Sequence, residues 1–241
     1  MKNAFHRRLG GLLKGQVSDS LPIGILLTFT GGYLDAYTYF SRGGIFANAQ
    51  TGNIVLLGIR LAEGQWLHAL EYLVPIFSFV LGVYIAEEIQ WHHKWRQAVH
   101  WRQIVLLIEV AILAVVAFLP HSVNELANSA VSFVCALQVD SFRKIRGHSM
   151  ATTMCTGNLR IATEAVSLFR HRREPLLLKK GAVYYGSIAV FILGAVTGKL
   201  LTGWMDTRAA LFCCLLLFIG FVLMFIREEK EGSEEKQDGE A

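Results

Sequence analysis

The chain has 241 residues, of which 53% are hydrophobic and only 17% are charged, and its formal net charge is +4. Soluble domains carry about a quarter charged residues, and here the charges stand in short segments between long apolar runs. This composition excludes an ordinary soluble enzyme and predicts a multi-pass membrane protein, because several runs approach the roughly 20 residues that cross a bilayer. Since the basic residues flank apolar runs, we expect a lipid bilayer as partner and no nucleic acid.

Residues 1–20 are basic and lack the short apolar core and small-residue cleavage site of a signal peptide. We expect them to form a cytoplasmic leader. Residues 227–241 are highly charged, and we expect a disordered tail there. Between them we predict eight helices, at about residues 21–40, 50–63, 67–89, 103–119, 124–143, 155–169, 179–202 and 207–226.

Two copies of one polar tripeptide stand at the starts of the second and sixth predicted helices. Thr51-Gly52-Asn53 and Thr156-Gly157-Asn158 lie 105 positions apart, and Asp35 and Asp140 show the same separation. Equal offsets of this kind indicate an internal repeat. We therefore predict two homologous halves, residues 21–119 and 120–226.

The distribution of basic residues predicts how the halves face. If the second and sixth helices do not fully cross, 15 basic residues gather on one side of the membrane, which is then the cytoplasmic side. The fold predicted is all-α: six transmembrane helices with both termini cytoplasmic, plus two short helices, arranged as two inverted repeats. Inverted repeats whose short helices meet near the midplane are typical of secondary transporters. Because Arg60 and Glu63 end the second helix, a position on the membrane surface stays open as an alternative.

The tripeptides suit a helix that starts inside a membrane. Thr and Asn side chains can accept hydrogen bonds from the first free N–H groups of a helix. Two helix N-termini that point at one centre favour an anionic or carbonyl-bearing ligand. The alternative interpretation is that both tripeptides only cap buried helices and allow close packing.

Three acidic residues fall within predicted spans, where ionisable groups are costly and often functional. Asp35 lies among glycine and aromatic residues, whereas Asp140 stands close to Arg143, so an ion pair is the alternative to a functional role. Glu109 is deeply placed and has Cys214 as its repeat counterpart. Proton coupling and a hydrogen bond between two helices both remain open for Glu109.

Other motifs are weak. The four cysteines lie in or beside apolar runs and show neither a disulfide framework nor metal-ligand spacing. Small residues at Gly194 and Gly198, and at Ser78 and Gly82, would permit close helix packing. No catalytic motif is present, so we expect no enzyme, no metal and no cofactor.

The segment from Gly31 to Gly58 resembles the YoaK-like family of bacterial multi-pass membrane proteins. The second half is also similar, with Leu137-Gln138 followed by basic residues and Thr-Gly. The resemblance implies a bacterial inner membrane and no particular activity. It is carried in the first half by Gly32, Asp35, Ala36, Gly43, Gly44, Phe46, Thr51, Gly52, Asn53, Leu57 and Gly58.

Together these features predict a small secondary transporter for an unidentified small polar or anionic solute. The rival interpretation is a non-transporting membrane sensor or assembly partner whose polar residues fix helix packing, and an assembly of several copies stays open. Asp35 and Glu109 are the candidates for proton coupling. The predicted solute site consists of Asp35, Thr51, Gly52, Asn53, Gln138, Asp140, Thr156, Gly157 and Asn158.

Overall fold

The computed structural model describes residues 20–93, 101–145, 148–149 and 152–238, and these residues are almost entirely helical. Residues 1–19 of the predicted leader and residues 239–241 of the predicted disordered tail therefore lie outside the described residues, whereas residues 227–238 of that tail continue helix α9. Short elements connect the helices: η2 (His121–Val123), η3 (Asp206–Ala209), and a two-residue antiparallel pair, β1 (Lys144–Ile145) with β2 (His148–Ser149). The helices are α2 (Leu21–Ser41), α3 (Gln50–Ala62), α4 (Trp66–His93), α5 (Trp101–Phe118), α6 (Asn124–Ser141), α7 (Cys155–Arg172), α8 (Pro175–Met205) and α9 (Ala210–Asp238).

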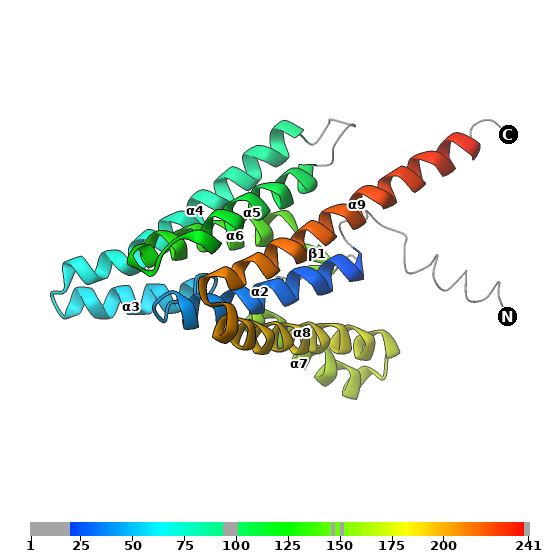
Figure 1. Ribbon diagram of the computed structural model, residues 1–241. Coiled ribbons are helices and arrows are strands. Elements are labelled where there is room, and N and C mark those ends of the chain that lie inside the picture. Colours follow the sequence, from blue (N-terminus) through cyan, green and yellow to red (C-terminus); the bar gives the residue numbers. More distant parts are fainter. Residues whose placement is uncertain (1–19, 94–100, 146–147, 150–151, 239–241) are drawn as a thin grey trace.

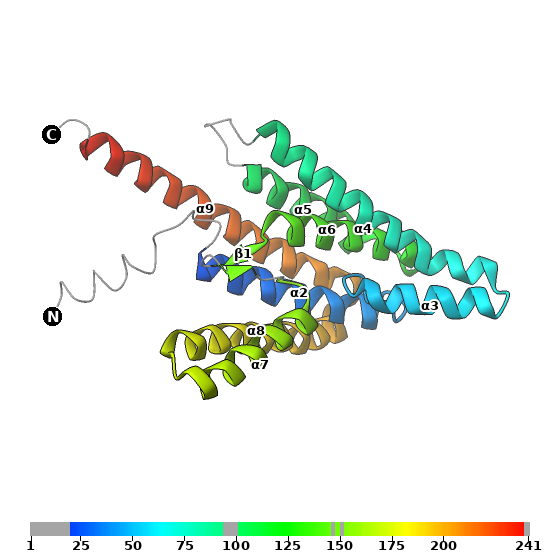
Figure 2. The same ribbon diagram turned by 180° about the vertical axis from the view of Figure 1, so that it is seen from behind.

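The helices form an elongated bundle with two distinct ends (Figure 1). We call one the α3 end, where α2, α5 and α8 finish, and the other the α7 end, where the same three helices begin. The short helix α3 runs toward the first end and α7 toward the second, and both views agree on this (Figure 2). The two short helices therefore point in opposite directions along the bundle.

Helix pairing crosses between the two halves of the chain. Helix α2 packs along α8, α4 packs along α6, and α5 packs along α9. Each short helix instead packs on the long helix that follows it, α3 on α4 and α7 on α8. The main core lies where α2, α5, α6 and α9 meet, and it includes Leu34, Leu113, Val134 and Leu217.

Within the part of the chain that the structure describes, three stretches are long and apolar enough to cross a membrane by length and composition: Trp66–His92, Trp101–Phe118 and Pro175–Phe225, the last of which covers α8 and the first part of α9. Helices α2 and α6 fall outside these three stretches because polar residues interrupt their apolar sequences. Four of these polar residues, Thr30, Asp35, Ser132 and Gln138, are buried. A helix enclosed by other helices needs no apolar surface toward lipid. Large apolar side chains are exposed elsewhere, including Leu67, Phe77, Leu200 and Trp204, as expected for a surface that faces lipid.

The long helices approach one another most closely at glycine residues, which have no side chain to separate the two backbones. A Cβ added at Gly32 would lie 2.0 Å from the Phe191 carbonyl oxygen, and one at Gly194 would lie 2.1 Å from that of Phe29. In the α4–α6 pair, a Cβ at Gly82 would lie 2.6 Å from the Phe133 carbonyl oxygen. The packing role predicted for Gly194, Gly198 and Gly82 is confirmed, because backbone atoms leave no room for a side chain.

We expect Gly194→Ala to destabilise the protein, because its methyl group can be accommodated only if α2 and α8 move apart. Overpacking of this kind lowers the free energy of unfolding by about 1–3 kcal/mol. In a chain of this size, each kcal/mol lost lowers the melting temperature by about 2–4 °C. The measurement is the melting temperature of the purified protein in detergent. Gly203→Ala is the matched control on the same helix, because a Cβ there meets nothing within 4 Å. Equal melting temperatures for the two variants would contradict the packing described.

The α3 end is fastened by Arg42, which is completely buried. Its Nη2 donates to the carbonyl oxygen of Val116 (2.6 Å), and its Nη1 donates to that of Leu119 (2.9 Å). Its Nε donates to the hydroxyl of Tyr37 at 2.9 Å. A guanidinium group thus satisfies the last carbonyls of α5, where a positive charge is favourable.

Asp206 joins two further segments at the same end. Its carboxylate accepts a hydrogen bond from the Ser41 hydroxyl at 3.0 Å and lies 2.7 Å from Nε2 of His121. The hydroxyls of Tyr33 and Tyr37 donate to the carbonyl oxygens of Ala209 and Thr207. The end of α2 is therefore held firmly against the connection between α8 and α9.

Candidate functional site

After α2 ends at the α3 end, residues 42–49 return into the bundle before α3 begins. The backbone N–H of Asn48 donates to Oδ1 of Asp35 at 3.1 Å, although Asp35 lies nearly two turns before the end of α2. The N–H of Ala47 donates to the hydroxyl of Thr38 at 3.3 Å. Buried side chains of α2 therefore hold this returning segment.

The same segment is bound from the other half of the chain. The hydroxyl of Ser132, on α6, donates to the carbonyl oxygen of Ala47 at 2.6 Å. The side-chain amide of Gln50 donates to the same oxygen at 2.7 Å. Ala47 therefore forms a small polar junction between α2, α3 and α6.

The segments that precede the two short helices meet each other directly. Nδ2 of Asn48 donates to the carbonyl oxygen of Thr153 at 2.8 Å. These two residues are 105 positions apart, the same offset that relates the tripeptides. A Cβ added at Gly31 would lie 3.3 Å from the Thr152 carbonyl oxygen, so the second segment also lies against α2. The starts of α3 and α7 are thus joined in the interior.

The helix starts differ from the predicted caps. Helix α3 begins at Gln50 after Ala49, and α7 begins at Cys155 after Met154, and neither start has a side-chain cap hydrogen bond. Asn53 instead donates to the carbonyl oxygen of Phe46 at 3.2 Å and to Oε1 of Gln50 at 3.1 Å. The prediction that these tripeptides supply N-caps is therefore wrong, because each tripeptide already lies within the first turn of its helix.

Several buried polar atoms around this junction lack a hydrogen-bond partner among the described residues: Oδ1 of Asn48, Oγ1 of Thr153 and Oε1 of Gln138. The orientation of each side-chain amide follows from the hydrogen bond that its nitrogen donates. Nδ2 of Asn48 donates to the carbonyl oxygen of Thr153, and Nε2 of Gln138 donates to the carbonyl oxygen of Leu27 at 3.0 Å. Their oxygens therefore remain available as acceptors. Buried polar atoms without partners are unusual and suit a bound water, ion or solute.

The predicted site residues fall into two groups. Asp35, Asn53, Gln138 and Asn158 are buried, with 8% exposure at Asp35 and 2% at Asn53. By contrast, Thr51, Thr156 and Gly157 are exposed, and a Cβ added at Gly52 or Gly157 would meet nothing within 4 Å. Hydrogen bonds to Asn48, Gln50 and Thr152 place Asp35, Asn53 and Gln138 at the junction. Asn158 is buried in the first turn of α7, and the two glycines have no packing role.

The remaining acids lie apart from the junction. Asp140 pairs with Arg143, which also pairs with Glu87 on α4, as the ion-pair alternative for Asp140 requires. Glu109 is wholly buried in α5, and both of its carboxylate oxygens lack a hydrogen-bond partner among the described residues. The helix-to-helix hydrogen bond considered for Glu109 is thus not seen there. Cys214, which the predicted repeat pairs with Glu109, contacts the neighbouring residue, with its Sγ 3.6 Å from the Val110 carbonyl oxygen.

Metal binding finds no support in the geometry of the described residues, which contain no cluster of three or more His, Cys, Asp or Glu side chains. Cys135, Cys155, Cys213 and Cys214 are free thiols. The carboxylate, amide oxygens and helix N-termini of the junction can instead bind a small solute or accept a proton.

Three important residues escaped the sequence interpretation: Arg42, Asn48 and Thr153. For Asn48 and Thr153 a signal existed, because both are polar, share the 105-position offset and stand just before the short helices. For Arg42 the sequence offered no clear signal. Two of its partners are the backbone carbonyls of Val116 and Leu119 at the end of α5, and backbone groups cannot be recognised from residue types.

Comparison with known proteins agrees with the presence of helices long and apolar enough to cross a membrane. The family model described as protein of unknown function (DUF1275) matches residues 23–223, from α2 well into α9. The UPF0700 transmembrane protein YoaK of Bacillus subtilis (strain 168) is 25% identical over 180 residues, which cover 71% of this chain and 79% of that protein. No solved structure matches the chain. The chain is therefore a transmembrane protein that belongs to the DUF1275 family and is a YoaK-like member, as its first motif indicated.

Proposed function

We propose that the chain is a small secondary transporter of the bacterial inner membrane, with six spans arranged as two inverted repeats. In this proposal α3 and α7 start near the membrane midplane and run back to opposite faces. The solute site lies between their starts, beside Asp35, Asn48 and Thr153. The contact between Asn48 and Thr153 is the observation that carries the proposal.

The symmetry argument rests on equivalent residues. Residues related by an internal two-fold axis can touch each other only where they lie close to that axis, and Asn48 and Thr153 are such a pair. The helix pairing supports the same axis. The 105-position offset makes α2, α3, α4 and α5 equivalent to α6, α7, α8 and α9. Under this equivalence the α2–α8 pair corresponds to α6–α4, the α3–α4 pair to α7–α8, and the α5–α9 pair to itself. Opposite directions of α3 and α7 favour an axis in the membrane plane over one along its normal (Figure 1).

The length of α3 and the charged composition of α7 support six spans over eight. Helix α3 has 13 residues, which correspond to about 20 Å at 1.5 Å per residue. The hydrocarbon core is about 30 Å thick, so α3 reaches from the middle to one face but does not cross. Helix α7 carries Arg160, Glu164 and three basic residues in its last turn, which suits a position near the membrane surface.

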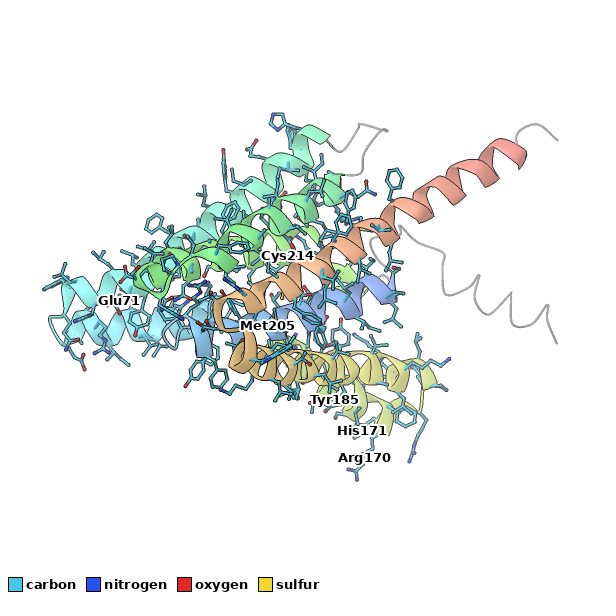
Figure 3. The ribbon with its side chains drawn as sticks, viewed as in Figure 1. Glu71, Arg170, His171, Tyr185, Met205 and Cys214 are labelled. Atoms are coloured by element: carbon cyan, nitrogen blue, oxygen red, sulfur yellow. The ribbon has the colours of Figure 1, made fainter. Side chains whose placement is uncertain are left out.

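The charge distribution supports a cytoplasmic α7 end. Figure 3 labels Arg170 and His171 at the outer end of α7, and Glu71 at the opposite end of the molecule. By the positive-inside rule the more basic end faces the cytoplasm. Described basic residues at the α7 end are Arg102, Arg143, Lys144, Arg170, Arg172, Arg173, Lys179 and Lys180, against Arg42, Arg60, Lys199 and Arg208 at the α3 end.

The chemistry of the junction supports a small anionic or zwitterionic solute. Two helix starts without side-chain caps present backbone N–H groups and partial positive charge to the same region. The free oxygens of Asn48 and Thr153 add acceptors for a protonated or amine group. Asp35 is the proposed proton-coupling residue, since it contacts the returning segment through the backbone of Asn48, and Glu109 is a second candidate.

A thermal-shift screen of the purified protein tests the proposal. The probes are phosphate, sulfate, succinate, citrate, glutamate and glycine, each offered at several pH values. We expect at least one to raise the melting temperature and to enter proteoliposomes that contain the protein. Absence of both effects for a broader panel of metabolites would overturn the transporter proposal.

A non-transporting sensor or assembly partner remains the rival, and one observation favours it. Asp35, Asn53 and Asn158 are almost fully enclosed, and hydrogen bonds fasten the returning segment to α2 and α6. A transporter must open such a centre alternately to both faces, whereas a sensor need not. Labelling of a cysteine at position 53 by a membrane-impermeant thiol reagent during turnover would favour transport over this rival.

A further inference from the structure

A groove separate from the central junction lies between α2 and α8 near the α7 end. It has a volume of about 320 Å³ and is lined mainly by apolar groups, among them Leu21, Gly24 and Ile25 of α2 and Val183, Gly186 and Val190 of α8. A Cβ added at Gly186 would meet nothing within 4 Å, so the groove is open at this glycine. It runs from Leu21 to Thr28 along α2, about 10 Å at 1.5 Å per residue, which is most of the depth of one leaflet's hydrocarbon layer.

The mouth of the groove is suited to an anion. Helix α2 starts at Leu21, which lines the groove, and its N-cap residue Ser20 makes no side-chain cap hydrogen bond. Ser20 is only 9% exposed, and its hydroxyl has no hydrogen-bond partner among the described residues. Pro22 contributes no N–H and that of Gly24 is bonded to the Ser20 carbonyl oxygen, so the N–H groups of Leu21 and Ile23 and the unpaired Ser20 hydroxyl are what favours an anion here.

A cation stands on the α8 side of the mouth. Lys179 precedes Ala182, Val183 and Gly186 by three, four and seven residues, so it lies on the helix face that lines the groove. It is exposed, and no ion pair with a described carboxylate involves it. The mouth therefore combines a lysine charge with the positive end of α2, directly above an apolar channel.

We propose that this groove binds one anionic phospholipid from the leaflet at the α7 end. Its phosphate lies at the N-terminus of α2, between Ser20 and Lys179, and one acyl chain lies in the groove between α2 and α8. An apolar channel alone would accept any lipid tail, whereas the mouth selects the negative headgroup. This site is independent of the central junction and does not rest on transport.

The test measures lipid binding to the full-length protein in detergent by native mass spectrometry. The probes are phosphatidylglycerol and phosphatidylcholine with identical acyl chains, and inorganic phosphate alone. We expect phosphatidylglycerol to bind at least about fivefold more tightly, the effect of one basic residue near an anionic lipid. Lys179→Gln should remove this preference and leave phosphatidylcholine binding unchanged, whereas Lys199→Gln, at the far end of α8, should behave as the wild type.

A second pair of variants tests the groove itself. Gly186→Leu fills it and should weaken both lipids by at least about tenfold, because two buried methylenes already account for that factor. Gly203→Leu is the control, since position 203 is also open and lies at the other end of α8. If Gly186→Leu fails to fold, Ala182→Leu takes its place.

Four outcomes would overturn the proposal. The first three are equal binding of both lipids to the wild type, unchanged lipid binding in the groove variants, and binding of inorganic phosphate as tight as that of phosphatidylglycerol. A change of oligomeric mass in Gly186→Leu without any loss of lipid would assign the groove to a second copy of the chain, and would also overturn it.

Discussion

Replacing Arg42 with methionine should prevent accumulation of folded protein. Arg42 is wholly buried, and its guanidinium donates to the carbonyl oxygens of Val116 and Leu119, to the Tyr37 hydroxyl and to Oδ1 of Asn124. Methionine fills similar space but leaves these acceptors without a donor. Each unsatisfied buried group costs about 1–3 kcal/mol. The total loss therefore approaches the free energy of unfolding of a typical protein, about 5–15 kcal/mol.

The measurement is the monodisperse yield and the melting temperature after detergent extraction. Arg60→Met is the matched control, because Arg60 is an exposed cation that pairs with Glu63 at 3.0 Å. Exposed pairs contribute about 0–1 kcal/mol, so this variant should resemble the wild type. Arg42→Lys should be intermediate, because it keeps the charge but loses the forked geometry. A stable Arg42→Met protein would contradict the role described for this residue.

The second large effect is expected at Asp35. Asp35→Asn removes the charge but keeps an oxygen that can accept the hydrogen bond from the Asn48 backbone N–H. The protein should therefore fold, with a melting temperature close to that of the wild type. If Asp35 carries the coupled proton, solute uptake driven by a proton gradient should fall at least about a hundredfold, comparable to loss of a general acid–base group.

Asp140→Asn is the control supplied by the repeat. Asp140 is the counterpart of Asp35 but pairs with Arg143 outside the junction, so its neutralisation should leave uptake largely intact. Uptake and thermal shift are measured for both variants with whichever probe the screen identifies. If Asp35→Asn unfolds the protein, or if uptake survives it, Asp35 has only a structural role.

The architecture could be predicted from the sequence where local patterns determine it. The repeat offset placed the starts of α3 and α7 at equivalent residues, and the small residues at Gly194 and Gly82 predicted close helix contacts that the structure confirms. The offset works because each half must satisfy the same local constraints. Apolar and amphipathic runs likewise located the long helices within about four residues, except at the end of α9, which continues to Asp238 beyond the predicted residue 226.

The site was predicted only in part, because its contacts depend on tertiary structure. Asn53 was expected to cap α3, but it bonds back to Phe46 because the chain re-enters the bundle before the helix starts. Thr51 and Thr156 share the tripeptides but face outward. The residues that join the halves, Asn48 and Thr153, stand just before the tripeptides, where a returning loop can cross from one half to the other.

The central claim, that α3 and α7 enter from opposite faces without crossing, is tested most directly by cysteine labelling. Cys135, Cys155, Cys213 and Cys214 are first replaced with alanine. Single cysteines are then placed in three connections between helices, at Gln65, Ser122 and Glu174, and intact cells are treated with a membrane-impermeant maleimide. Permeabilised cells provide the total labelling at each position.

The six-span arrangement with a cytoplasmic N-terminus predicts labelling at Gln65 and Ser122 in intact cells and labelling at Glu174 only after permeabilisation. An arrangement with eight crossings places all three positions in the cytoplasm. Protection of Gln65 and Ser122 in intact cells, or labelling of Glu174 there, would contradict the inverted repeat and the transport site built on it.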